Sequence, residues 1–115
     1  MPYLCVETNT ALSPSAERAF LERATDWVET RLDKPRALVM VAIDAGRPMA
    51  FAGSDDPAAF VRLKSIGLET GACPELAAAL SGFIHTELGI APERVFLEFQ
   101  NLERALFAWN GKTFA

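Results

Sequence analysis

The sequence contains only two cysteines, Cys5 and Cys73, and a single histidine, His85, among its 115 residues. Two widely spaced thiols are too few for a disulfide framework or for a zinc site. We therefore expect both cysteines to be reduced and the chain to bind no metal. His85 follows the apolar Ile84 in a predicted helix, so we expect a surface or partly buried helix residue rather than a catalyst.

Clusters of basic residues are also missing. The chain has 11 Lys and Arg against 15 Asp and Glu, which gives a formal net charge of −4. Binding to nucleic acid depends on clustered cations that neutralise phosphates and release counterions. Nucleic acid is therefore not an expected partner.

No hydrophobic run approaches the ~20 residues of a membrane-spanning helix, and the first residues have neither the basic nor the apolar segment of a secretory leader. We therefore expect a cytoplasmic protein with no membrane partner. Hydrophobic residues nevertheless make up 50% of the chain and charged residues 23%. Small domains bury a small fraction of their surface, so this composition suggests one domain, residues 1–115, that contacts other subunits.

The spacing of apolar residues predicts a β-α-β unit in the first half. YLCVET (3–8) alternates as a strand does, and Ser13-Pro14 is a typical helix start. Pro35 ends the helix, and the apolar run ALVMVAID (37–44) predicts a second strand. The predicted helix has apolar residues at spacings of three and four: Leu21, Ala24, Val28 and Leu32.

The second half repeats this pattern. IGLET (66–70) is similar to LCVET and is predicted as its equivalent strand, and Cys73-Pro74 takes the place of Ser13-Pro14. Gly89 is a natural end for the second helix, and RVFLEFQ (94–100) alternates as a final strand. The second helical stripe consists of Leu76, Leu80, Phe83, Ile84 and Leu88.

These elements predict an α/β (α+β) fold in which two pseudo-twofold β-α-β units form a four-stranded mixed sheet covered by two antiparallel helices. Asn110-Gly111 adds a tight hairpin and so a pair of short extra strands in the tail. The face of the sheet without helices includes apolar side chains, and we expect it to meet copies of the chain around a symmetry axis.

Several short segments, spread over the whole chain, carry a resemblance to known proteins by their residues and their order. They are Met1-Pro2, Thr8-Asn9, Lys34-Pro35, PMAFAGS (48–54), SIG (65–67), PERV (92–95) and AWNGKTFA (108–115). With these segments the chain resembles the macrophage migration inhibitory factor family of the tautomerase superfamily, and several spaced matches are more specific than any single one. The resemblance implies a homotrimer with three active sites between subunits. It also implies cofactor-free keto-enol tautomerisation of aryl α-keto acids such as phenylpyruvate.

The resemblance makes Pro2 the catalytic base. Proline at this position permits removal of Met1 by methionine aminopeptidase, which leaves a free secondary amine. Lys34 matches the family lysine that binds the substrate carboxylate, and its positive charge would favour the unprotonated amine. The alternatives are a proline without a role at the start of a strand, and a lysine that interacts with the C-terminal end of a helix.

Other positions match the family's substrate pocket. Ile66 matches a residue whose backbone contacts substrate, although a core residue would look the same. Lys64 is a second cation that could reach the mouth of the pocket, with an exposed, solvated lysine as the alternative. Phe107, Trp109 and Phe114 match the apolar rim, and we expect part of this aromatic set to pack between subunits.

Two positions depart from the best-known mammalian member, which has tyrosine and asparagine where this chain has Phe96 and Glu98. Phe96 keeps an aromatic wall and loses a hydroxyl group. Glu98 would repel an anionic substrate unless it accepts a hydrogen bond from a phenol, pairs with a lysine or points to solvent. We therefore expect weaker or differently selective activity.

The resemblance leaves a second function open, that of a cytokine-like binding protein with a vestigial pocket. Such a protein could leave the cell without a leader, and any residues that contact a receptor cannot be identified from the sequence. A thiol redox activity has been proposed for the mammalian factor at a Cys-x-x-Cys pair, and it is excluded at the corresponding site here, because that site reads PAAF (57–60).

Overall fold

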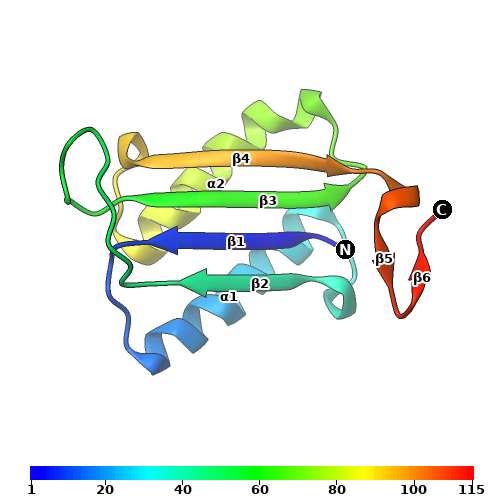
Figure 1. The fold of residues 1–115 in the computed structure, drawn as a ribbon, viewed down its shortest axis with the longest axis horizontal. Helices are drawn as coiled ribbons and strands as arrows, with labels where there is room; N and C mark the ends of the chain where they lie inside the picture. The colour runs from blue at the N-terminus through cyan, green and yellow to red at the C-terminus, as the bar shows by residue number, and fades with distance from the viewer.

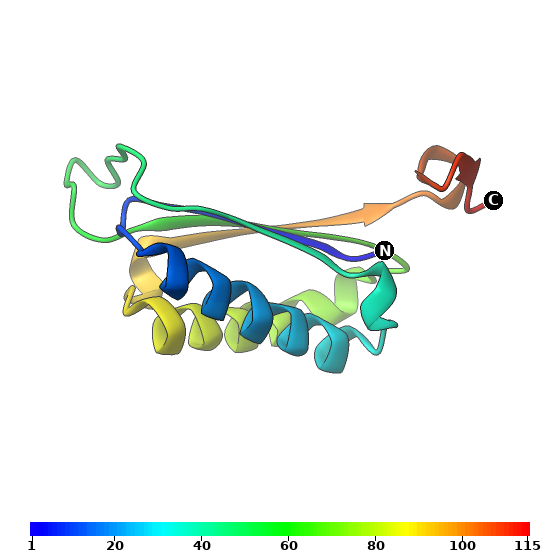
Figure 2. The same ribbon diagram turned by 90° about the horizontal axis from the view of Figure 1, so that it is seen from below.

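The computed structural model describes residues 1–115 and places two helices on one face of a four-stranded sheet (Figures 1 and 2). The elements in chain order are β1 (Tyr3–Thr8), α1 (Pro14–Leu32), β2 (Met40–Asp44), β3 (Ala59–Ile66), α2 (Cys73–Leu88), β4 (Val95–Leu102), β5 (Ala108–Trp109) and β6 (Lys112–Thr113). Short 3-10 turns precede β2, α2, β4 and β5. Neither long helix combines the length and the hydrophobicity needed to cross a lipid bilayer.

The strand order is β2-β1-β3-β4, with parallel pairs at both edges and an antiparallel pair, β1 and β3, in the middle. Each parallel pair is joined by one of the helices, so the two β-α-β units meet along β1 and β3. The colours of α1 and α2 in Figure 1 run in opposite directions along the sheet. The predicted mixed sheet and antiparallel helix layer are confirmed.

Every second side chain of the two central strands, β1 and β3, points into the space between the sheet and the helices. Leu4, Val6 and Thr8 of β1 are fully buried, whereas the residues between them are half-buried on the open face. β3 likewise buries every second residue from Ala59 to Ser65. The helices bury Phe20, Ala24 and Val28 from α1 and Leu76, Leu80 and Ile84 from α2.

Two predicted strands differ from the structure. The prediction of a strand at 66–70 is wrong, because β3 ends at Ile66 and the chain turns at Gly67, whose φ is +76°. The side chain of Asn101 stabilises this turn, since its oxygen accepts hydrogen bonds from the Gly67 and Leu68 N–H groups at 3.1 and 3.2 Å. In the predicted strand at 37–44 only Met40–Asp44 forms a strand, because a 3-10 turn over Arg36–Leu38 follows Pro35.

Replacing Ser13 with alanine tests how α1 begins. The Ser13 hydroxyl accepts a hydrogen bond from the Ala16 N–H at 3.1 Å, and Pro14 stands at the first turn. We expect Ser13→Ala to lower the free energy of unfolding by about 1 kcal/mol. The measurement is denaturant unfolding at one fixed protein concentration.

Ser81→Ala is the matched control, because Ser81 lies inside α2 and caps nothing. Alanine is the better helix former at an interior position, so this variant should be as stable as the parent or slightly more stable. Equal effects of the two substitutions would contradict the capping role of Ser13.

Candidate active site

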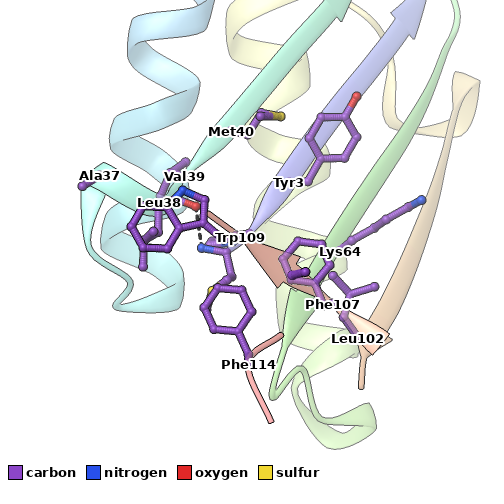
Figure 3. Close-up of a pocket in the computed structure, with 13 residues that line it drawn as sticks. Tyr3, Ala37, Leu38, Val39, Met40, Lys64, Leu102, Phe107, Trp109 and Phe114 are labelled. Carbon is purple, nitrogen blue, oxygen red and sulfur yellow. Dashed lines mark hydrogen bonds between the residues drawn. The ribbon is translucent and has the colours of Figure 1, made fainter. Parts of the chain in front are cut away.

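A cavity of about 670 Å³ lies at the end of the sheet where β1 begins (Figure 3). Its wall comes from the chain start, the turn before β2, Lys64 of β3, the end of β4 and the tail. Eleven of its 13 lining residues are hydrophobic, and none is acidic. The lining consists of Met1, Pro2, Tyr3, Ala37, Leu38, Val39, Met40, Lys64, Leu102, Phe107, Ala108, Trp109 and Phe114.

Hydrogen bonds to Leu38 and to Met40, the first residue of β2, fix the chain start. Pro2 is buried, and its carbonyl accepts a hydrogen bond from the Met40 N–H at 3.0 Å. The amino group of Met1 donates to the carbonyl of Leu38. Because Pro2 precedes the first strand residue, its missing N–H leaves no gap in the ladder of the sheet.

Lys34 lies close to this amino group. α1 ends at Leu32, and its C-cap residue Asp33 has a left-handed φ of 50°. The chain then brings the half-buried Lys34 toward the end of β3. The Lys34 ammonium donates to the carbonyl of Ile66 at 3.5 Å. Burial, and secondly the positive charge of Lys34, lower the pKa of the amino terminus below its usual value of 8.0. Lys34 itself is not part of the cavity wall.

Ile66 contributes to the site through its backbone. Its side chain is 6% exposed in the core, and its carbonyl accepts hydrogen bonds from Lys34 and from the hydroxyl of Ser65, the latter at 3.2 Å. Ile66 is absent from the cavity wall. In this structure it therefore holds Lys34 in place rather than lining the cavity.

The tail closes one side of the cavity with aromatic rings. The predicted hairpin at Asn110-Gly111 is present, with φ values of 53° and 77° that suit a tight turn between β5 and β6. The rings of Phe107 and Phe114 stack at 5.7 Å, and the Phe114 N–H donates to the Phe107 carbonyl at 3.0 Å. Both rings and Trp109 line the cavity, as Figure 3 shows.

Phe96 and Glu98 do not join this cavity within one chain. Across β3 and β4, Lys64 is opposite Gln100, Arg62 is opposite Glu98, and Phe60 is opposite Phe96. At ~3.3 Å per residue, Glu98 is about 7 Å and Phe96 about 13 Å along the strand from the level of Lys64. Phe96 instead stacks on Phe51 at 4.8 Å and is 59% exposed.

Glu98 belongs to a row of alternating charges on the open face of the sheet. Arg62 lies 3.4 Å from Glu98 and 3.2 Å from Glu7. Glu7 also pairs with Arg47, which contacts Asp44 at 3.0 Å. The carboxylate of Glu98 is thus neutralised by an arginine of its own chain.

Comparison with known proteins places this geometry in a family. The sequence profile described as Macrophage migration inhibitory factor (MIF) matches residues 1–115. The chain belongs to the macrophage migration inhibitory factor family. It is 36% identical over 118 residues to a macrophage migration inhibitory factor homolog of Brugia malayi, and the match covers 99% of both chains. It is also 35% identical over 108 residues to the D-dopachrome decarboxylase of Gallus gallus, and this match covers 90% of this chain and 88% of that one.

A solved structure supports the same fold. The macrophage migration inhibitory factor homologue from Prochlorococcus marinus superposes with a TM-score of 0.90 at 29% identity and covers 98% of this chain and 99% of that one. The two helices and the four-stranded mixed sheet are therefore those of the macrophage migration inhibitory factor fold.

The sequence did not reveal several residues of this family member's cavity. Tyr3, Met40 and Leu102 line it but carry no chemical signature, and only the folded chain brings them together. Arg62 could have been noticed, because it faces the same way as Lys64 two residues later. Its partner Glu98 could not be assigned without the register of β3 and β4.

Removing the positive charge at position 34 tests the electrostatics of the chain start. In Lys34→Gln the repulsion between two cations disappears, so the pKa of the amino terminus should rise, while burial still holds it below the value of an exposed amine. The measurement is the pH dependence of acylation of the amino terminus, located by peptide mass spectrometry.

Lys112→Gln provides the control, because Lys112 lies in the tail hairpin and its charge is not a cause of the shift. This variant should titrate like the parent. An unchanged midpoint in Lys34→Gln would show that the lysine does not act on the amino group.

Proposed function

We propose that this protein is a cofactor-free keto-enol tautomerase that acts on phenylpyruvate-like aryl α-keto acids. The observation that carries the proposal is the place of Pro2, buried at an apolar cavity of about 670 Å³ with the cation of Lys34 close to the chain start. The chicken relative, named D-dopachrome decarboxylase, supports an enzyme in the family.

The proposed chemistry requires removal of Met1, which turns the Pro2 nitrogen from an amide into a secondary amine. The neutral amine takes a proton from the carbon next to the keto group of the substrate. That C–H bond breaks, a carbon–carbon double bond forms, and the keto oxygen receives a proton back from the protonated proline. The reverse sequence converts enol to ketone, so no oxidant, metal or cofactor takes part.

A base that works near neutral pH needs a lone pair there. An α-amino group already titrates at about 7.7 to 8.0, whereas the secondary amine of proline is more basic. Burial and Lys34 lower the pKa of the Met1 amino group at the chain start, and after removal of Met1 both would act on the Pro2 amine in the same direction. Lys34 lies outside the cavity wall of the single chain, close to the chain start, and would also bind the carboxylate of the keto acid that reaches Pro2. One cation would then both bind the substrate and favour the neutral base.

The rest of the cavity suits an aromatic ring. Phe107, Trp109 and Phe114 offer an apolar wall, and Trp109 is 60% exposed in the single chain. In the proposed homotrimer, Phe96 of the partner subunit supplies a further wall and Glu98 of the partner subunit stands at the rim. The exposure of the Phe96 ring in one chain supports such a contact.

A cytokine-like binding protein is the second candidate, favoured by the name of the Brugia malayi relative. Release from the cell would fit this role, and a cytoplasmic location would fit the enzyme. The two functions separate at Pro2, because receptor binding depends on surface residues and the tautomerase depends on one buried nitrogen.

Pro2→Gly removes the secondary amine and tests the base directly. We expect kcat/KM for phenylpyruvate to fall by about two orders of magnitude or more, which is the usual contribution of a general base. Turnover is followed by the ultraviolet absorbance of the enol, and light scattering checks that the trimer persists.

Pro14→Ala is the matched control, since Pro14 stands at the exposed start of α1, and it should keep parental turnover. Intact mass of the parent protein should show that Met1 has been removed. Parental turnover in Pro2→Gly, or full activity in a chain that retains Met1, would refute the proline mechanism.

The pair of Arg62 and Glu98 gives a second test of the site. In the trimer, Arg62→Gln would leave Glu98 unpaired near an anionic substrate, and we expect kcat/KM for phenylpyruvate to fall roughly two- to fivefold, as for loss of an exposed ion pair. The double variant Arg62→Gln with Glu98→Gln should recover most of the loss.

Measuring kcat/KM for hydroxyphenylpyruvate in the parent, in Arg62→Gln and in the double variant shows whether the pair affects the choice between the two substrates. If the double variant is no better than Arg62→Gln alone, repulsion by Glu98 is not the cause. In that case Glu98 does not approach the substrate of the partner subunit's site.

A further inference from the structure

Lys64 is the one basic side chain in the wall of the cavity, which contains no acidic side chain. It lies on the open face of β3 and is half-buried. In Figure 3 the ammonium end of Lys64 points away from Leu38 and Trp109 and toward β4. The charge therefore stands at the rim of the cavity, on the side of β4.

The ammonium of Lys64 has no acidic partner, in contrast to the other cations of the open face. Arg47 and Arg62 each contact two carboxylates. Lys64 forms no ion pair, and its neighbours across the two adjoining strands are Tyr3 and Gln100. Lys64 therefore differs from Arg47 and Arg62, the other two cations of the open face, in having no carboxylate to neutralise it.

We propose that Lys64 binds a second anionic group of the substrate, so that the site prefers aryl α-keto acids with a carboxylate at the far end of the ring. The inference rests on the proposed function, in which Lys34 receives the carboxylate of the keto acid beside Pro2. The ring then crosses the apolar wall, and the distal carboxylate emerges at the rim where Lys64 stands.

The chemistry of the wall supports this substrate class. A distal carboxylate within an apolar cavity would lose hydration without compensation, whereas at the rim it keeps water on one side and meets an ammonium on the other. Lysine suits this task, because its flexible stem carries a point charge with three donors to ligands of different length. An exposed pair of this kind weakens as salt increases.

The experiment compares kcat/KM for 4-carboxyphenylpyruvate and phenylpyruvate in the parent, in Lys64→Gln and in Arg18→Gln. We expect the parent to prefer the dicarboxylate and Lys64→Gln to lower the ratio of the two values about fivefold, as for loss of one exposed charge pair. Arg18→Gln removes an exposed charge from α1 and should leave the ratio unchanged.

A binding measurement separates this inference from the proposed function. Calorimetry with 4-carboxycinnamate and cinnamate, two unreactive aryl acids, reports the second anion site without any turnover. If the parent turns over neither keto acid, the tautomerase proposal fails, whereas a preference for 4-carboxycinnamate that Lys64→Gln removes still supports the role of Lys64.

Two results would overturn the inference. One is a ratio that is the same in the parent and in Lys64→Gln, both in turnover and in binding. The other is a weaker trimer in Lys64→Gln and in Glu98→Gln alike with no change of the ratio, because Lys64 would then pair with Glu98 of the partner subunit instead of the ligand.

Discussion

The amino terminus lies directly before β1, a central strand of the sheet, and the rest of the candidate site is arranged around this position. β1 lies between β2 and β3, so backbone hydrogen bonds hold it on both sides. Pro2 tolerates this place because it stands one residue before the ladder, where its missing N–H costs nothing. A nitrogen at the end of a flexible terminus could not be held against a cavity wall in this way.

The same strand order explains why Lys34 reaches the chain start. α1 leaves from the far end of β1 and returns antiparallel to it, so its last residues lie beside the beginning of the strand (Figure 1). Asp33 in a left-handed conformation ends the helix, and the Ile66 carbonyl holds the ammonium of Lys34. The crossover connection thus brings two residues 32 positions apart, Pro2 and Lys34, to one end of the sheet.

Most of the fold could be predicted from periodicity, since α1, α2, β1 and β4 have clear spacings of apolar residues and clear end signals. The prediction of a strand at 66–70 is wrong because it relies on the similarity of IGLET to LCVET. The alternation of buried and half-buried residues from Ala59 to Ser65 marks the true strand. The interaction of Asn101 with Gly67 that ends β3 spans 34 residues and leaves no local trace in the sequence.

The candidate site was less accessible to prediction than the fold. Composition and spacing alone did not single out Pro2, Lys34 or the tail rings, and their selection came from the resemblance to a family. The ion pairs of the open face can be predicted only when the register between the strands is known. A slip of one residue in a strand would turn all of its side chains to the other face. For Glu98 the sequence allows a lysine as partner, whereas in the structure the partner is Arg62.

Arg62 and Lys64 lie two residues apart on the same strand, but Arg62 forms ion pairs within the chain whereas Lys64 has no such partner and can bind a ligand. Both face the open side of β3, but Arg62 lies between two carboxylates across the sheet, and its planar guanidinium can contact both. Two residues later the neighbours are Tyr3 and Gln100, so the charge of Lys64 stays available. Because a free charge at an apolar rim attracts an oppositely charged group, the residue that the fold leaves unpaired is the one able to select a ligand.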